Sequence, residues 1–308
     1  MTRSFDILVA GEINPDLILT GDVAPIFGQV EKLIDSASLA IGSSSAIFAC
    51  AAARLGLKVT FIGLCGDDIF GHFMLDEMSK RGVDVSNVVG IPSGQTGLSV
   101  ILSRGVDRAI LTHPGLISTL KAEAVPDRLL RKSRHIHVAS YFLQTSLQPG
   151  LPGLFARAQA LGLSTSLDTN WDPSGKWRGF NSLLQKVDVF LPNKKETLAL
   201  TGTKRIGPAS QKLSGLCKVV AIKLGADGAI ARRGEETARV RAQKIMVVDT
   251  VGAGDTFDAG FLFGWLNGWS LEKTLALAVA CGSLSTQAPG GTSAQPTLEE
   301  AMKYVKST

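Results

Sequence analysis

Short apolar runs alternate along the chain with longer segments whose apolar residues recur at helical spacing. This alternation predicts an α/β fold, in which helices cover both faces of a mostly parallel sheet. The apolar runs predict strands at residues 5–10, 59–63, 135–139, 164–168, 187–191 and 219–224. The segments with helical spacing predict helices at residues 44–55, 69–81, 151–161, 195–200, 256–267, 271–285 and 298–305.

Two segments depart from this alternation and predict a small antiparallel flap beside the main sheet. They cover residues 14–36 and 97–111, and in the second segment apolar runs at 98–102 and 109–111 flank a turn at 104–108. Such a flap can close over a bound substrate and exclude water. The alternative is an additional edge hairpin that does not move.

Composition narrows the function classes. The 308 residues, 45% of them hydrophobic, are enough for one large α/β domain or two smaller ones. The N-terminal apolar run is short and ends at Glu12, so we expect no signal peptide, no membrane span and a cytoplasmic protein. The net charge of +5 forms no long basic run, which argues against nucleic-acid binding and suits anionic substrates. The four cysteines form no Cys-x-x-Cys pair, which argues against zinc and redox sites.

The most informative motif is the segment 249–255, Asp-Thr-Val-Gly-Ala-Gly-Asp, which leads directly into an apolar helix. Because Gly252, Ala253 and Gly254 are small, their backbone N–H groups can turn toward one point. The N-terminus of the following helix adds positive potential there, so the motif predicts a phosphate site. Asp255 lies in the first helical turn and can accept a proton from a hydroxyl at the same point.

Other interpretations of this motif are a helix cap or a different glycine-rich loop. Asp255 could serve only as the N-cap, with Asp258 as a capping-box partner. A Walker loop needs Gly-x-x-x-x-Gly-Lys, and a dinucleotide fingerprint needs a third glycine where Phe257 stands. Neither pattern occurs elsewhere in the chain, and the complete string favours catalysis over capping.

The segment 249–255 resembles the second signature of the ribokinase or PfkB family of carbohydrate kinases, and further matches follow in family order through nearly the whole chain. The resemblance implies a ribokinase-like three-layer sandwich with a mostly parallel central sheet and a small β lid. It implies a single kinase domain over residues 1–308, with lid segments at about 12–37 and 91–113. The implied activity is transfer of the γ-phosphoryl group of ATP to a hydroxymethyl group, with Mg²⁺, Asp255 as base and the 252–255 loop as anion hole.

Two segments resemble the family's acceptor-binding parts. In segment 11–16, Asp16 is expected to hydrogen-bond sugar hydroxyls, and a simple turn residue is the alternative. Segment 42–47 matches the first signature only in part, because Ser43 replaces a glycine and Ile47 replaces the sugar-binding asparagine. Its serine hydroxyls either replace part of the lost polar contact or cap the next helix. The residues expected to bind the acceptor are Asn14, Asp16, Gly42, Ser43 and Ser45.

Three further segments resemble the donor and cation sites. Asn193 and Glu196 match a motif that holds hydrated magnesium, and an ordinary first-turn acid is the alternative for Glu196. Segment 223–228 resembles the strand-turn-strand beside the nucleotide phosphates, or is a plain hairpin turn. Segment 288–291 resembles the loop over adenine, which together with Asp249 holds K⁺ in many relatives. The residues expected to bind nucleotide are Asn193, Lys223, Gly225, Gly228 and Gly290.

The substrate stays open at this stage. Segment 167–170 resembles the family's Asp-x-Asn segment, but Trp171 stands where arginine is usual. A sugar kinase is the leading interpretation, and a nucleoside kinase of the same family is the second, because the sugar-binding asparagine is missing. A non-catalytic sugar-binding relative is the third. The resemblance also implies a homodimer joined through the lid.

Overall fold

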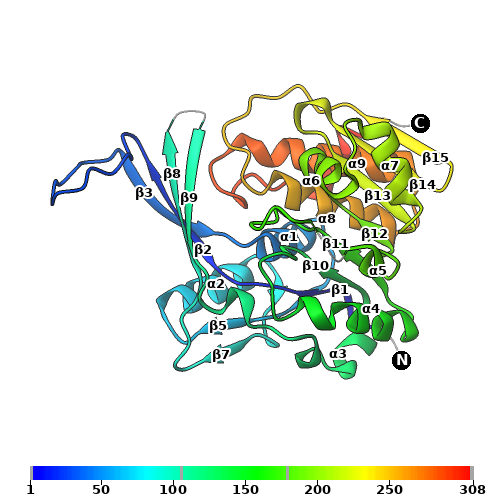
Figure 1. Cartoon of the computed structure of the whole chain (residues 1–308), viewed down its shortest axis with the longest axis horizontal. Coiled ribbons are helices and arrows are strands. Elements are labelled where there is room, and N and C mark those ends of the chain that lie inside the picture. Colours follow the sequence, from blue (N-terminus) through cyan, green and yellow to red (C-terminus); the bar gives the residue numbers. More distant parts are fainter. Residues whose placement is uncertain (1–2, 105–106, 178–179, 306–308) are drawn as a thin grey trace.

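The computed structural model describes residues 3–104, 107–177 and 180–305. Within these residues a nine-stranded sheet runs through the middle of the molecule, in the order β15-β14-β13-β12-β11-β10-β1-β4-β6 (Figure 1). The strands from β13 to β6 are parallel, and β14 and β15 are antiparallel at one edge. The bounds are β1 Phe5–Ala10, β4 Val59–Ile62, β6 Val83–Asp84, β10 Ser133–Val138, β11 Ser164–Leu167, β12 Val189–Phe190, β13 Val219–Lys223, β14 Ala229–Arg233 and β15 Glu236–Val240.

Each face of this sheet is covered by helices. Along β1, Ile7 and Val9 enter one hydrophobic core and Leu8 and Ala10 enter the other, as expected for a strand buried on both faces. One core contains residues of α1 Ser44–Arg54, α2 Ile69–Lys80, α8 Ala253–Leu266, α9 Leu271–Leu284 and α10 Leu298–Met302. The other contains residues of α3 Asp127–Arg131, α4 Leu151–Ala160, α5 Phe180–Leu184, α6 Lys194–Thr201 and α7 Ile206–Ser214. The three-layer sandwich is therefore confirmed.

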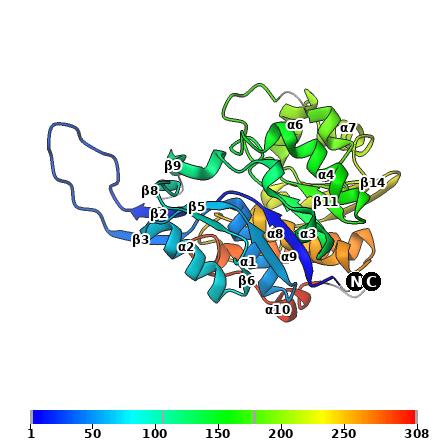
Figure 2. The ribbon, with the colours of Figure 1, turned by 90° about the horizontal axis from the view of Figure 1, so that it is seen from below.

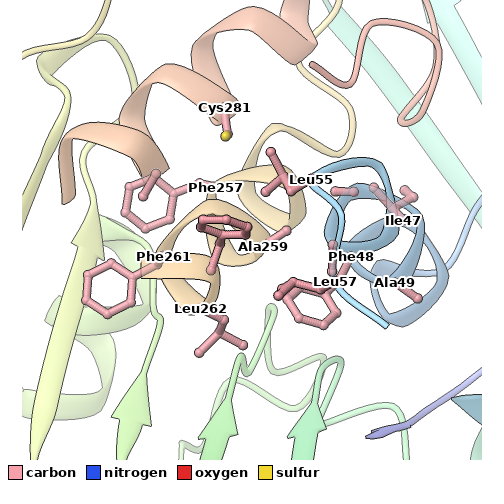
Figure 3. Close-up of a cluster of buried hydrophobic side chains, with 14 of the residues drawn as sticks. Ile47, Phe48, Ala49, Leu55, Leu57, Phe257, Ala259, Phe261, Leu262 and Cys281 are labelled. Atoms are coloured by element: carbon pink, nitrogen blue, oxygen red, sulfur yellow. The ribbon is translucent and has the colours of Figure 1, made fainter. Parts of the chain in front are cut away.

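Helix α8 is held tightly between α1 and α9. Figure 3 shows Phe257 and Phe261 of α8 and Ile47 and Phe48 of α1 in one buried cluster. On the side toward α9, a Cβ at Gly260 would lie 2.9 Å from the Cα of Ala278. Glycine thus lets the two helix backbones approach closely, and this packing fixes the position of the loop that precedes α8.

The small β lid is a four-stranded sheet within the described residues, in the order β3-β2-β8-β9. Its bounds are β2 Pro15–Thr20, β3 Ser36–Ile41, β8 Leu98–Arg104 and β9 Asp107–His113. The antiparallel prediction is correct for β2 with β3 and for β8 with β9, but wrong for β2 with β8, which pair in parallel. Both β2 and β8 run from the central sheet toward the free end of the lid. The two strands therefore point in the same direction. Residues 105–106 of the predicted turn lie outside the described residues.

The loop between β2 and β3 projects away from the rest of the molecule in both views (Figures 1 and 2). A further two-stranded sheet pairs β5 Leu64–Gly66 with β7 Val89–Ile91. Among the described helices, none combines the length and the apolar character needed to cross a membrane.

Several element bounds differ from the predictions. The helix predicted at 256–267 begins at Ala253, because Gly252 adopts the left-handed conformation with φ 70° and forms the N-cap. The helix predicted at 298–305 ends at Met302. Helix α7 and strand β15 were not predicted, because each is short and contains too few apolar residues for a clear periodic pattern.

Candidate active site

A cavity of about 1680 Å³ opens between the lid and the carboxyl ends of the central strands. This is the edge where open α/β sheets bind ligands. Segments that are far apart in sequence supply its walls, including the lid strands β8 and β9, the start of α1, the start of α6 and the loop before α8. Its lining includes Glu12, Asn14, Asp16, Ser43, Ser44, Ile47, Asp168, Asn170, Trp171, Asn193, Glu196, Lys223, Gly225, Gly228, Gly252, Ala253, Gly254 and Asp255.

The glycine-rich loop and Asp255 face this cavity. Gly252 is the N-cap of α8, and no side chain caps the helix, so the interpretation of Asp255 as an N-cap is wrong. Ala253, Gly254 and Asp255 form the first helical turn and line the cavity. The Asp255 carboxylate is therefore positioned beside a helix N-terminus, as the sequence predicted for a base beside a phosphate.

The surroundings of Asp255 disfavour its charged form. Burial, and then the negative charge of Asp168, raise the pKa of Asp255 to about 8. Lys223 and a hydrogen bond with Ser44 act in the opposite direction. The Ser44 hydroxyl also accepts a hydrogen bond of 2.6 Å from the side-chain amide of Asn170. Ser44 was not among the candidate residues, although it lies in the segment that matches the first signature.

Lys223 lines the cavity, but its ammonium group is engaged with carboxylates. The Nζ atom lies 2.8 Å from Asp168 and 3.1 Å from both oxygens of Asp258. The family resemblance implied nucleotide binding for Lys223, and Asp258 was considered only as a capping-box partner in the alternative to catalysis by Asp255. The structure instead joins both residues, together with Asp168, in one buried ion network.

At the lid end of the cavity, Asn14 and Asp16 are buried lining residues. Burial raises the pKa of Asp16 to about 7, Arg108 counteracts this shift, and the negative charge of Asp249 adds to it. A side chain at Gly42 would overlap the Asp16 carboxylate, so glycine at this position leaves the space that Asp16 occupies.

The serines at the start of α1 have different roles. Ser43 has φ 63°, accepts a hydrogen bond of 3.0 Å from the Ala46 N–H and donates one of 2.7 Å to the Glu12 carbonyl. The capping alternative is thus confirmed for Ser43, which also lines the cavity. Ser45 is fully buried away from the cavity and donates to the Glu12 carboxylate, which corrects its expected substrate role. Ile47 lines the cavity.

Asn193 and Glu196 form a capping box at the start of α6. The Asn193 side chain accepts a hydrogen bond of 3.0 Å from the Glu196 N–H, and Glu196 accepts one of 2.8 Å from the Asn193 N–H. Glu196 is therefore a first-turn acid, as the alternative held, and it also lines the cavity. Burial, and then the negative charge of Asp168, raise the pKa of Glu196 to about 7. A cation beside the Glu196 and Asp168 carboxylates would be stabilised by their negative charges. Asn193 and Glu196 therefore fit a hydrated divalent ion.

The remaining residues that the sequence predicted to bind the nucleotide lie on turns or loops. Gly225 and Gly228 have φ 62° and 86°, and both line the cavity. A side chain at Gly228 would overlap the backbone of Val240, so the turn packs directly on the end of β15. Gly290 is not among the cavity-lining residues, and its N–H donates to Asp249 at 2.9 Å. The Asp249 carboxylate also lies 3.7 Å from Arg108 of the lid.

Comparisons with known proteins show the family to which the chain belongs. The profile of the family described as pfkB family carbohydrate kinase matches residues 5–298. The chain belongs to this family. An ATP-dependent ribose-1-phosphate kinase of Halopiger xanaduensis is 30% identical over 303 residues, which cover 97% of each chain. A 2-dehydro-3-deoxygluconokinase of Bacillus subtilis is 29% identical over 89% of each chain. The structure of Arabidopsis thaliana ribokinase with ribose and ATP superposes with a TM-score of 0.86 at 24% identity, and the match covers 100% of each chain.

This pfkB family kinase is thus a sugar kinase whose acceptor end departs from the usual pattern. The side chain of Ile47 packs beside the backbone of Gly252 and Gly291, so a hydrocarbon stands where the family motif has an amide. Trp171 lines the cavity with 55% of its surface exposed. Glu12, which lines the cavity, and Asp258, which contacts the cavity-lining Lys223, were missed as site residues, because nothing in their local sequence shows these tertiary contacts.

Proposed function

We propose that the protein transfers the γ-phosphoryl group of ATP to a hydroxymethyl group of a small sugar or sugar derivative. The observation that carries this proposal is the placement of Asp255 and the N-terminus of α8 on the wall of the large cavity, which Asp16 also lines. One carboxylate can thus address the attacking hydroxyl while a second one holds the sugar. The Arabidopsis ribokinase, solved with ribose and ATP, has the same fold and supports this use of the cavity.

In this mechanism the chain's own groups mainly align the reactants and balance charge. Phosphoryl transfer through a loose transition state requires alignment and charge neutralisation more than a strong base. Asp255 orients the acceptor hydroxyl and takes its proton as the bond to phosphorus forms. The backbone amides of Gly252, Ala253 and Gly254 hold the oxygens of the transferred group as an anion hole. The acceptor is held by Asn14, Asp16, Gly42 and Ser43.

The proposal also assigns residues to the binding of ATP and its cations. Asn193 and Glu196 would hold hydrated Mg²⁺, which neutralises phosphate charge when bound. Gly225 and Gly228 lie along the phosphates, where their turn brings backbone close to the nucleotide. Asp249, beside Gly290, is the proposed site of a monovalent cation such as K⁺.

The test is an ADP-release assay with ATP and Mg²⁺, with and without K⁺, across a panel of acceptors. The relatives named above act on ribose 1-phosphate and on 2-dehydro-3-deoxygluconate, and Arg108 places one positive charge in the acceptor end of the cavity. The panel therefore contains both of these compounds, together with ribose, fructose, adenosine, inosine and cytidine. ADP release with a sugar or sugar derivative supports the proposal. No ADP release with any acceptor, while a sugar still binds, would show a non-catalytic sugar-binding relative.

A nucleoside kinase is the second candidate. Ile47 removes the polar contact that the family makes to sugars, and the half-exposed Trp171 offers a flat aromatic face to the same cavity. A planar base would suit such a surface. In the panel, phosphorylation of nucleosides but not of sugars would favour this candidate.

We further propose that residues 1–308 form one kinase domain, with lid segments at about 12–37 and 91–113, and that two lids join in a homodimer. The described lid residues expose large apolar side chains, among them Phe27 at 94% and Leu33 at 86%. Ile110 and Leu111 on β9 are also more than half exposed. Monomeric proteins rarely leave such a patch in water, so a second lid is a suitable cover.

A further inference from the structure

Three buried carboxyl groups gather beside the glycine-rich loop, and two of them, Asp168 and Asp255, line the cavity. Asp168 follows β11, and Asp255 and Asp258 lie one turn apart on α8. Each offers an oxygen within 4.8 Å of the others, and all three residues are buried. Negative charges this close inside a protein repel one another strongly unless a cation or a proton accompanies them.

The positive charge in this group comes from Lys223, the last residue of β13. Its ammonium contacts Asp168 at 2.8 Å and Asp258 at 3.1 Å, with only 13% of the lysine side chain exposed. It also lies just beneath the loop, because a Cβ at Gly254 would be 3.5 Å from Nζ. Two carboxyl groups therefore hold the ammonium in place.

The pKa values of the two carboxyl partners of Lys223 shift in opposite directions. Burial opposes ionisation of Asp168, but the charge of Lys223 and hydrogen bonds from Lys223, Asp258 and the Asn170 backbone together outweigh it and lower the pKa of Asp168 below its ordinary value. Burial raises the pKa of Asp258 well above its ordinary value, although the ammonium of Lys223 acts in the opposite direction. Lys223 thus makes its shortest carboxylate contact with Asp168, whose ionised form it favours, and Asp258 accepts further hydrogen bonds from the same ammonium.

We propose that Lys223 is a positioning residue that neutralises Asp168 and thereby favours the ionised, proton-accepting form of the neighbouring Asp255. This inference rests on the proposed role of Asp255 as base. It assigns Lys223 to the acceptor chemistry rather than to nucleotide binding, which was the prediction from sequence.

The charges that face Asp255 support this assignment. Asp168 from the end of β11 and Glu12 from the end of β1 raise the pKa of Asp255 in addition to burial, whereas Lys223 lowers it. The Ser44 hydroxyl of α1 also lowers it, through a hydrogen bond. The negative charge of Glu196 on α6 also acts on Lys223 and raises its pKa, after the larger effects of burial, Asp168 and Asp258. Without the ammonium, the charged groups that act on Asp255 would be the carboxyl groups of Asp168 and Glu12.

The test is a titration of Asp255 itself, in the full chain labelled with ¹³C at the aspartate carboxyl carbons. The Asp255 resonance is assigned as the one that disappears in Asp255→Asn. We expect Lys223→Met to raise the titration midpoint by about one pH unit or more, and Lys223→Arg to leave it within a few tenths. Asp168→Asn should lower the midpoint, and the double variant Lys223→Met/Asp168→Asn should return it toward the wild-type value, because both charges of the pair are gone.

An Asp255 midpoint that is unchanged in folded Lys223→Met would overturn the inference. If Lys223→Met does not fold, the Asp255 midpoints of Asp168→Asn and of the double variant test the inference. If the midpoint of the double variant differs from the wild-type midpoint by as much as that of Asp168→Asn alone, the inference is also overturned. The acidic limb of the kcat/KM profile, measured with the best acceptor of the panel, should move with the midpoint. The effect of Lys223 on Asp255 and the role of Asp255 as base are tested separately. If Asp255→Asn keeps its activity, Asp255 is not the base, but the measured titration midpoints of Asp255 still test the effect of Lys223.

Discussion

The backbone N–H of Gly290 donates a hydrogen bond of 2.9 Å to the carboxylate of Asp249. This contact ties the loop after α9 to the start of the segment that holds the proposed anion hole. Gly252 lies at the same junction with φ 70°, and a Cβ there would be 2.7 Å from the Cα of Gly291. The two loops therefore meet backbone to backbone, with no room for a side chain.

Gly252→Ala should lower both stability and activity. The added Cβ meets backbone that cannot move away easily, and alanine in the left-handed region costs on the order of 1–2 kcal/mol. Thermal unfolding should show a melting temperature several degrees lower, and ADP release should fall at least about tenfold if the loop shifts. The matched control is Gly254→Ala, whose Cβ would have 3.5 Å to its nearest neighbour, Lys223 Nζ. Equal melting temperatures for Gly252→Ala and wild type would contradict the argument.

Asp255→Asn should lower kcat by about 10²–10⁴-fold, the range typical for loss of a general base. The fold should be unaffected, because Asp255 lines the cavity and does not cap α8. Steady-state ADP release and circular dichroism check these two expectations. Asp76→Asn, on an exposed part of α2 outside the cavity lining, is a suitable control that keeps the base. Near-normal turnover in Asp255→Asn would refute the assigned role.

The activity should depend on pH through the same carboxyl group. A base must be ionised to accept a proton, and burial and then the charge of Asp168 raise the pKa of Asp255 to about 8. We therefore expect kcat/KM to increase with pH up to a plateau above about pH 8. Rate profiles between pH 6 and pH 9.5 measure this limb. A flat profile over the whole range would show that another group, or no group, controls the reaction.

Asp16→Asn should abolish acceptor affinity but increase the stability of the free protein. Because the pKa of Asp16 is raised from 3.8 to about 7, chiefly by burial, its ionisation between these pH values costs folding free energy. The asparagine variant avoids this cost, so its gain should grow from pH 4 to pH 7 and stay constant above, on the order of 1–3 kcal/mol. Urea unfolding at pH 4.5 and pH 8 measures the difference. A variant that is less stable than wild type at pH 8 would contradict the prediction.

The lid patch predicts the oligomeric state. Phe27→Asp and Leu33→Asp place charges on side chains that are almost fully exposed, so neither change should disturb the monomer fold. If two lids join, sedimentation velocity should show a dimer for wild type and a monomer for the double variant. Met246→Asp, on a similarly exposed side chain outside the lid, is the control and should stay dimeric. A wild-type protein that is monomeric at high concentration would rule out the lid dimer.

Much of the architecture could be predicted because it depends on local patterns. The apolar runs of β1, β10 and β13 and the helical spacing of α4 and α9 fall close to their predicted bounds. The parallel pairing of β2 with β8 was missed, since which strands become neighbours depends on the direction in which each leaves the body and not on its own pattern.

The site residues divide in the same way. The sequence alone determined the glycine-rich loop and the carboxylate in the first turn of α8, because small residues and a helix start act through chain neighbours. Only the tertiary structure decided that Ser45 turns to Glu12 and that Lys223 pairs with Asp168 and Asp258. Those contacts join residues 30 to 60 positions apart, and their energies depend on burial and distance, which no local pattern contains.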